Sequence, residues 1–120
     1  MVCECHKDCK NLATGLCCVI PFGSFDPSVE GHLVIEELNM EFEVAPGVPI
    51  FFPSALYTHY NTELINYGVR GSFVAWTSGM IFQYVDLNFR AVKDLSKQEE
   101  KDYRVSVKAR IDAGLALLMS

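Results

Sequence analysis

Short apolar segments separated by turn-forming residues occupy the first two thirds of this 120-residue chain, and this regular spacing restricts the folds that the chain can adopt. Turn signals recur roughly every eight to twelve residues, a spacing typical of β-sandwiches and barrels rather than of βαβ units. We therefore predict a mainly β fold. The expected strands are Leu16–Phe22, His32–Leu38, Met40–Ala45, Ile50–Leu56, Arg70–Thr77 and Met80–Val85.

The clearest strand pattern is Met40–Ala45, in which methionine, phenylalanine and valine alternate with two glutamates. This is the period of a half-buried strand. Pro46-Gly47 follows and predicts a turn, because proline presets φ and glycine accepts positive φ. Asn61–Gly68 is expected to be a polar loop, and Ser78-Gly79 a second turn.

The C-terminal segment follows a helical period instead. Ser96-Lys97-Gln98-Glu99 forms a capping box, with serine at the N-cap and glutamate at the third helical position. Apolar residues then recur every three or four positions. We predict an amphipathic helix over about 96–118 that docks on the β core, within a single domain spanning residues 1–120. The apolar positions are Tyr103, Val107, Ile111, Leu115 and Leu118.

Composition narrows the class of protein. Half of the residues are apolar, which is enough for a packed core. Ten basic and fifteen acidic residues give a net charge of −5, which argues against non-specific binding to a phosphate backbone. The sequence shows no secretory signal and no apolar run long enough to span a membrane. Five cysteines, an odd number, crowd the first eighteen residues, and we expect reduced thiols in an intracellular protein.

The residues that point to chemistry begin with an H-x-D motif, His6 and Asp8, whose side chains would share one face of an extended strand. His59, at the end of an expected buried strand, is the candidate third ligand. Two imidazoles and one carboxylate suit a non-haem Fe(II) site, because they leave open positions on one face of the metal.

Arg70 and Ser72 form the second candidate group, at the start of the strand after His59. A hairpin would bring His59 and Arg70 into one cavity. Arginine can hold a carboxylate with two hydrogen bonds, and a serine two residues further on can add a hydroxyl. These residues predict a site for a keto-acid co-substrate, namely 2-oxoglutarate.

Two other interpretations of the polar residues stay open. Cys3, Cys5, His6 and Cys9 could form a zinc module, although their spacing matches no common zinc motif and free thiols are the simpler interpretation. His32 is expected at the surface, while the Cys17-Cys18 pair is expected to include a buried thiol.

Taken in order, the motifs resemble the fungal branch of the TET/JBP-like dioxygenases, which depend on 2-oxoglutarate and Fe(II). The resemblance covers nearly the whole chain. The motifs that carry it are H-x-D-x-x-N-L at His6–Leu12, F-D-P at Phe25–Pro27, G-H-L at Gly31–Leu33, P-S-A at Pro53–Ala55 with His59 and Asn61 after it, R-x-S-F at Arg70–Phe73 and F-x-Y-V at Phe82–Val85.

This resemblance implies a double-stranded β-helix, a jelly-roll relative of the cupins. It implies His6, Asp8 and His59 as iron ligands, and Arg70, assisted by Ser72, as the partner of the distal carboxylate of 2-oxoglutarate. The implied reaction is oxidation of methyl groups such as that of 5-methylcytosine, with nucleic acid as substrate, a flipped base, and a nuclear location.

One difference from that family concerns the N-terminus, since only five residues precede the H-x-D motif. We expect that an N-terminal part, including a core strand, is missing from this chain. A second copy could then supply the strand, which would make the protein a homo-oligomer. The alternative function is that of a catalytically degenerate β-sandwich relative used in binding or assembly.

Overall fold

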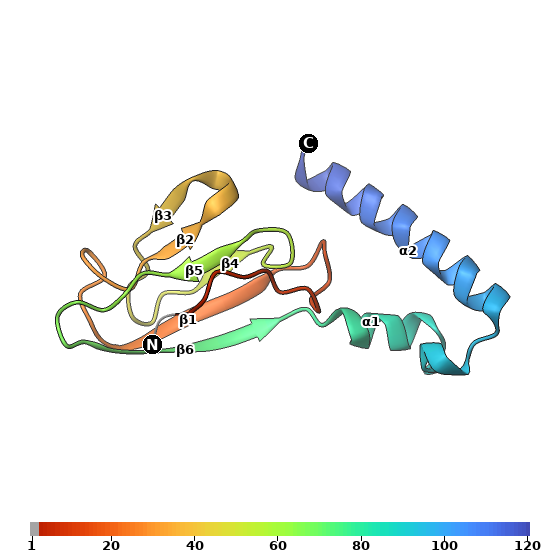
Figure 1. Cartoon of the computed structure of the whole chain (residues 1–120), viewed down its shortest axis with the longest axis horizontal. Helices are drawn as coiled ribbons and strands as arrows, with labels where there is room; N and C mark the ends of the chain where they lie inside the picture. Colours follow the sequence, from red (N-terminus) through yellow and green to blue (C-terminus); the bar gives the residue numbers. More distant parts are fainter. Residues whose placement is uncertain (1–2) are drawn as a thin grey trace.

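A computed structural model describes residues 3–120 as an elongated molecule of about 56 × 30 × 21 Å, with the strands at one end and the helices at the other (Figure 1). The strands are β1 (Cys17–Ser24), β2 (Leu33–Ile35), β3 (Met40–Phe42), β4 (Ile50–Phe52), β5 (His59–Asn61) and β6 (Val69–Trp76). The helices are the 3₁₀ turns η1 (Glu36–Leu38) and η2 (Val92–Asp94), and the α-helices α1 (Gly79–Asp86) and α2 (Lys97–Leu118).

The strands form two antiparallel sheets of three, in the orders β4-β1-β6 and β3-β2-β5. The long pair β1 and β6 is in register over eight residues, from Cys17 opposite Trp76 to Ser24 opposite Val69. Side chains of both sheets meet in one core that contains Cys17, Leu33 and Phe52. In the described residues the sheets do not close into a barrel, so the fold is mixed, and the prediction of a mainly β chain is right only in part.

The expected strands Met40–Ala45 and Ile50–Leu56 are shorter in the structure, where β3 ends at Phe42 and β4 at Phe52. Two other expected strands are partly or wholly helical. The segment 32–38 is a strand only at Leu33–Ile35 and then turns into η1, which ends at Asn39 in the left-handed region (φ 49°). The second difference is larger, because Met80–Val85 lies within helix α1. A run of six apolar and polar residues without a clear period fits either structure. Ser78 begins α1 as its N-cap, although its side chain makes no capping hydrogen bond.

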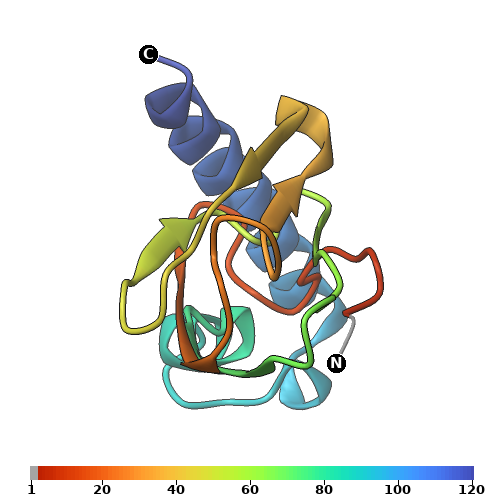
Figure 2. The same cartoon turned by 90° about the vertical axis from the view of Figure 1, so that its left-hand side faces the viewer.

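Helix α2 confirms the predicted capping box, since the Ser96 hydroxyl accepts from the Glu99 N–H while the Glu99 carboxylate accepts from the Ser96 N–H. The predicted docking on the β core is wrong. No residue of α2 is buried, and α2 lies beyond the ends of the sheets, beside α1 and segment 9–14 (Figures 1 and 2). An Arg110–Asp86 ion pair joins the two helices. In residues 3–120 no helix is both long and apolar enough to cross a bilayer.

Candidate metal centre

The structure brings His6, Asp8 and His59 together, with ligand atoms that all lie within 4.8 Å of one another. His6 and His59 face each other across an antiparallel bridge, in which each backbone N–H donates to the other residue's carbonyl at 3.1 and 3.0 Å. Their rings lie 4.5 Å apart. Within the described part of the chain, this is the single cluster of His, Cys, Asp and Glu side chains with the spacing of a metal site.

Backbone carbonyls orient both imidazoles toward the aspartate. His59 Nδ1 lies 2.9 Å from the Tyr57 carbonyl, and His6 Nδ1 lies 2.6 Å from the Glu4 carbonyl. Because a carbonyl can only accept, each Nδ1 is placed to donate a hydrogen bond, and in the neutral ring Nε2 then keeps a free lone pair. Those Nε2 atoms lie 3.3 Å (His6) and 4.0 Å (His59) from the oxygens of Asp8. The neutral tautomers are therefore the ones that can bind a metal.

A second layer of hydrogen bonds holds Asp8. Its backbone N–H donates to the Ser54 carbonyl at 3.0 Å. The Asn11 amide donates to an Asp8 oxygen at 3.3 Å and to the Ser54 hydroxyl at 3.1 Å. The sequence places Ser54, which is 1% exposed, and Asn11 only within motifs and gives neither of them a role at the site. No local pattern shows this role of Ser54, because it depends on segment 6–11 crossing the turn after β4. Such outer contacts fix ligand geometry and raise metal affinity.

Arg70 reaches the same cavity from the opposite sheet. The cavity has a volume of about 480 Å³, and both the three clustered residues and Arg70 line it. The predicted hairpin is wrong, since β5 pairs with β2 whereas β6 pairs with β1. His59 begins β5 instead of ending a strand. The two residues meet because the two sheets face each other, which no local sequence pattern could show.

The Arg70 guanidinium is partly desolvated. Its Nε is buried and has no hydrogen-bond partner among residues 3–120, and burial lowers the pKa of the guanidinium. The Phe25 ring lies 5.7 Å from its central carbon. Ser72 lines the cavity two residues further along β6. A half-buried guanidinium with one buried, unpaired N–H is costly to maintain, and an anionic ligand would satisfy it.

The remaining cavity wall is mostly apolar. It is formed by Cys17, Val19, Leu33, Val44, Ile50, Phe52 and Val74, with Tyr60 and Asn61 adding polar atoms. Cys17 is buried, as predicted for one thiol of the Cys17-Cys18 pair, and burial raises the pKa of its thiol. A pocket of this kind excludes water around a few polar groups, as small-molecule sites do.

Glu30 organises the loop that leads into β6. Its side chain is 1% exposed and accepts backbone N–H groups from Asp26, Ile65 and Asn66 at 2.8–3.1 Å. These bonds, led by that of Asn66, lower the pKa of the carboxyl. Segments on either side of β2 and β5 are thereby tied together just before Arg70. Glu30 therefore helps position Arg70 without touching the cavity.

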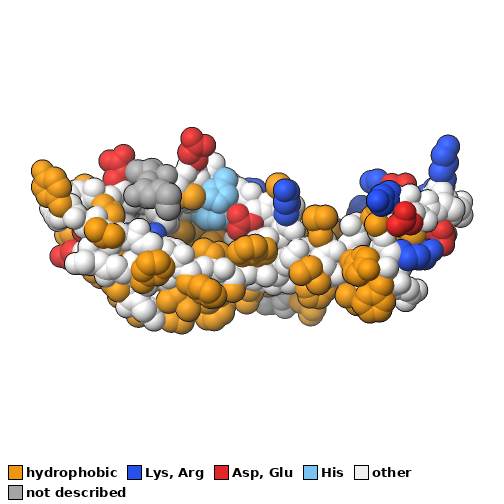
Figure 3. Space-filling model, turned by 90° about the horizontal axis from the view of Figure 1, so that it is seen from below, with side chains coloured by type: hydrophobic (Ala, Val, Ile, Leu, Met, Phe, Trp, Pro, Cys, Tyr) orange, Lys and Arg blue, Asp and Glu red, His pale blue; other side chains and the backbone are white. Residues whose placement is uncertain are grey.

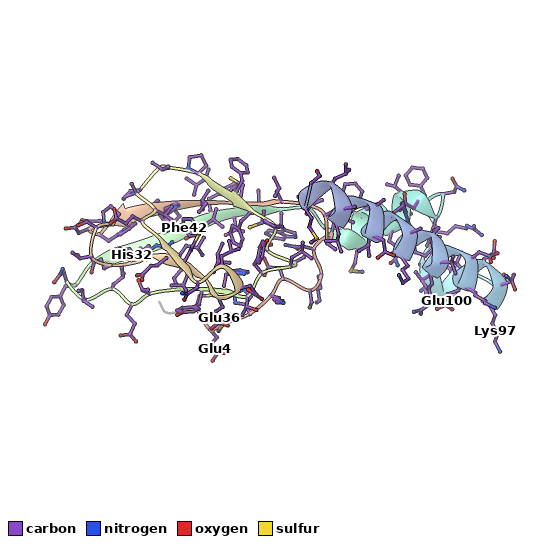
Figure 4. All side chains as sticks on the ribbon, turned by 90° about the horizontal axis from the view of Figure 1, so that it is seen from above. Glu4, His32, Glu36, Phe42, Lys97 and Glu100 are labelled. Atoms are coloured by element: carbon purple, nitrogen blue, oxygen red, sulfur yellow. The ribbon has the colours of Figure 1, made fainter. Side chains whose placement is uncertain are left out.

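The alternative zinc module does not assemble among the described residues. Cys3 Sγ lies 3.6 Å from His6 Nδ1, but Cys5 and Cys9 belong to no ligand cluster and all three thiols are exposed. The expected surface position of His32 is also wrong. Its side chain is only 14% exposed and pairs with Glu41. Figure 4 shows His32 beside Phe42 at one end of the β2–β3 hairpin, and Glu36 and Glu4 at the other.

A larger hollow of about 770 Å³ lies between α1, α2 and segment 9–14. It is lined by residues of both charges, including Arg104, Glu100 and Asp86, and none of the clustered ligands reaches it. The hollow remains because α2 packs only loosely against α1 and segment 9–14, with none of its residues buried. It offers no set of groups aimed at one ligand.

Comparison with known proteins leaves the site to be interpreted on its own geometry. No protein-family model matches the sequence, and no curated protein matches it.

Proposed function

We propose that this protein is an Fe(II)- and 2-oxoglutarate-dependent dioxygenase. The observation that carries the proposal is the cavity in which His6, Asp8 and His59 lie on one side and Arg70 on the other, with an Arg70 Nε that no residue of the described range 3–120 satisfies. Two imidazoles whose Nε2 atoms face one carboxylate form the donor set that suits non-haem Fe(II). With iron and the keto-acid bound, the centre would supply O₂ activation, which side chains alone cannot provide.

The protein's own residues have separate roles in this proposal. His6, Asp8 and His59 hold the metal, while Asn11 and Ser54 keep the aspartate in position. Arg70 and Ser72 bind the distal carboxylate of 2-oxoglutarate. The carbon chain of the keto-acid would lie along the apolar wall, where water is excluded and charge pairs are stronger.

The finer fold and the substrate rest on the motif resemblance. We propose that the two facing sheets form part of a double-stranded β-helix. We also propose that the substrate is a methyl group on a nucleic-acid base such as 5-methylcytosine, which would have to leave the base stack to reach the metal. The acidic chain, with a net charge of −5, implies weak non-specific binding, so recognition would have to be local.

An anaerobic titration with Fe(II) and then 2-oxoglutarate tests the proposal, because the chelate of the two gives a visible charge-transfer band. We expect the wild-type protein to develop the band. His59→Ala should lose it through loss of iron. Arg70→Ala should keep iron but bind 2-oxoglutarate far more weakly.

Matched controls separate the site from general damage to the fold. His32→Ala removes a histidine that does not line the cavity, and Arg104→Ala removes an exposed arginine of α2. Both should retain the band. A folded wild-type protein without the band, or equal losses in the site and control variants, would overturn the assignment and favour the degenerate binding relative.

A further inference from the structure

The β4-β1-β6 sheet has a second face, opposite the metal cavity. Side chains alternate along a strand, and residues directly opposite one another share a face. Cys17, Val19, Arg70 and Ser72 line the cavity, so the intervening residues point the other way. We call this set the outer face; it consists of Cys18, Ile20, Phe22 and Ser24 of β1, Phe51 of β4, and Val69, Gly71, Phe73 and Ala75 of β6.

The outer face is apolar and uncovered. Phe22, Phe51 and Phe73 are 57–61% exposed, and Val69 is 71% exposed. The far end of the Phe22 ring lies over Gly71, where a Cβ would come within 2.4 Å of it, so this side chain reaches from β1 across to β6. Figure 3, which views the molecule from below the orientation of Figure 1, shows hydrophobic side chains gathered along one edge over much of its length.

No charged residue interrupts this surface. Arg70 is the only charged residue in the three strands, and it faces the cavity. An antiparallel sheet that packs on one side normally presents polar side chains to water on the other. Here both faces are apolar, which is the pattern of a sheet covered on both sides. β6 is also an edge strand of eight residues without a proline or lysine to discourage association.

The exposed area approaches what a dimer requires. With roughly 150–250 Å² for each aromatic side chain, the three phenylalanines alone present on the order of 350 Å². Met80, Ile81 and Val85 of helix α1, which follows β6, are each at least half exposed. With Val69, these apolar side chains expose on the order of 700 Å² in all, near the ~800 Å² that each partner contributes to a standard interface.

We infer that the outer face binds a second copy of this chain, packed face to face across a two-fold axis. A two-fold interface requires a surface that complements itself. A face without charges meets this requirement, because no like charges are brought together, although the chain as a whole carries −5. Two sheets stacked in this way would lie about 10 Å apart and form a second core. The dimer would also stiffen β6, the strand that carries Arg70 and Ser72.

The test is the mass of the full chain in solution, measured by light scattering and sedimentation from about 1 to 100 µM, a range that spans weak to stable association. We expect about twice the 13.4 kDa of one chain. Val69→Glu and Phe73→Glu should each weaken the dimer at least tenfold, because each would bury an unpaired charge in an apolar interface. Val105→Glu is the matched control, since this valine is 65% exposed on α2, away from the outer face.

Circular dichroism must show that each variant is folded. Should Phe73→Glu unfold, Val69→Glu at the end of the strand still gives an answer. A folded wild-type protein of 13.4 kDa throughout the range would overturn the inference, and so would open-ended aggregates or equal effects of Val69→Glu and Val105→Glu. The measurement needs neither iron nor 2-oxoglutarate, so it is independent of the proposed activity.

Discussion

Replacing Arg70 by methionine should leave the free protein about as stable as before, yet remove most of its response to 2-oxoglutarate. Methionine keeps the apolar stem beside Gly31 and removes a guanidinium whose buried Nε has no partner. An unsatisfied buried donor costs about 1–3 kcal/mol, and here the low end applies because only one nitrogen is shut off from water. Losing the cation–π contact with Phe25 costs about 0.5–1 kcal/mol, which offsets most of the gain from removing the unsatisfied donor. The net change should lie within about 1 kcal/mol of zero.

The ligand-bound state should respond very differently. At a ligand concentration one hundred times Kd, binding stabilises the wild-type protein by about 2.7 kcal/mol. Losing a charge-assisted pair worth about 2 kcal/mol weakens binding about thirtyfold. The stabilisation at the same concentration should then fall to about 1 kcal/mol. The assay is urea unfolding followed by circular dichroism, under anaerobic conditions with Fe(II), in the presence and absence of 2-oxoglutarate.

Arg104→Met is the control, since Arg104 is an exposed arginine paired with Glu100 on α2. It should lose at most about 0.5 kcal/mol and keep the full ligand response. If Arg70→Met destabilised the free protein by 2 kcal/mol or more, Arg70 would be a structural residue. An unchanged response to 2-oxoglutarate would equally refute its role as the anion-binding group.

Three further predictions concern the hydrogen bond that holds Asp8, the N-cap of α2 and the buried carboxylate of Glu30. Asn11→Ala should weaken Fe(II) binding about 10–100-fold, because Asp8 loses the hydrogen bond that holds it in position. Asn66→Ala is the control and should leave Fe(II) binding unchanged. Competition with a metal-sensitive chelator measures both. Ser96→Ala should cost α2 about 1 kcal/mol and speed amide hydrogen exchange in its first turn, with metal binding unchanged. Glu30→Gln should destabilise the protein at neutral pH. Because hydrogen bonds lower the pKa of Glu30 in the folded state, its contribution is present above the ordinary carboxyl pKa and is lost as pH falls below it, so the urea midpoints of variant and wild type should converge in acid.

Local chemistry in the sequence predicted the elements that depend on neighbouring residues. The capping box placed the start of α2, the Pro46-Gly47 turn is present with Gly47 at φ 81°, and the strands around β1 and β6 were expected within one or two residues of their ends. Such features depend on interactions over a few positions. The strand predicted for residues 80–85 is part of helix α1, because so short an apolar segment fits a helix as well as a strand.

The residues of the candidate centre could be chosen from the sequence, but their arrangement could not. Residue types and spacing singled out His6, Asp8, His59 and Arg70 as groups with the right chemistry. Only the tertiary structure decided that two sheets, not one hairpin, bring them to a common cavity, and that Ser54 braces the aspartate. Pairing between distant strands depends on the burial of whole faces, which is a property of the assembled core. The same reason explains why α2 lies beyond the sheets and why an apolar face of the β4-β1-β6 sheet remains uncovered within one chain.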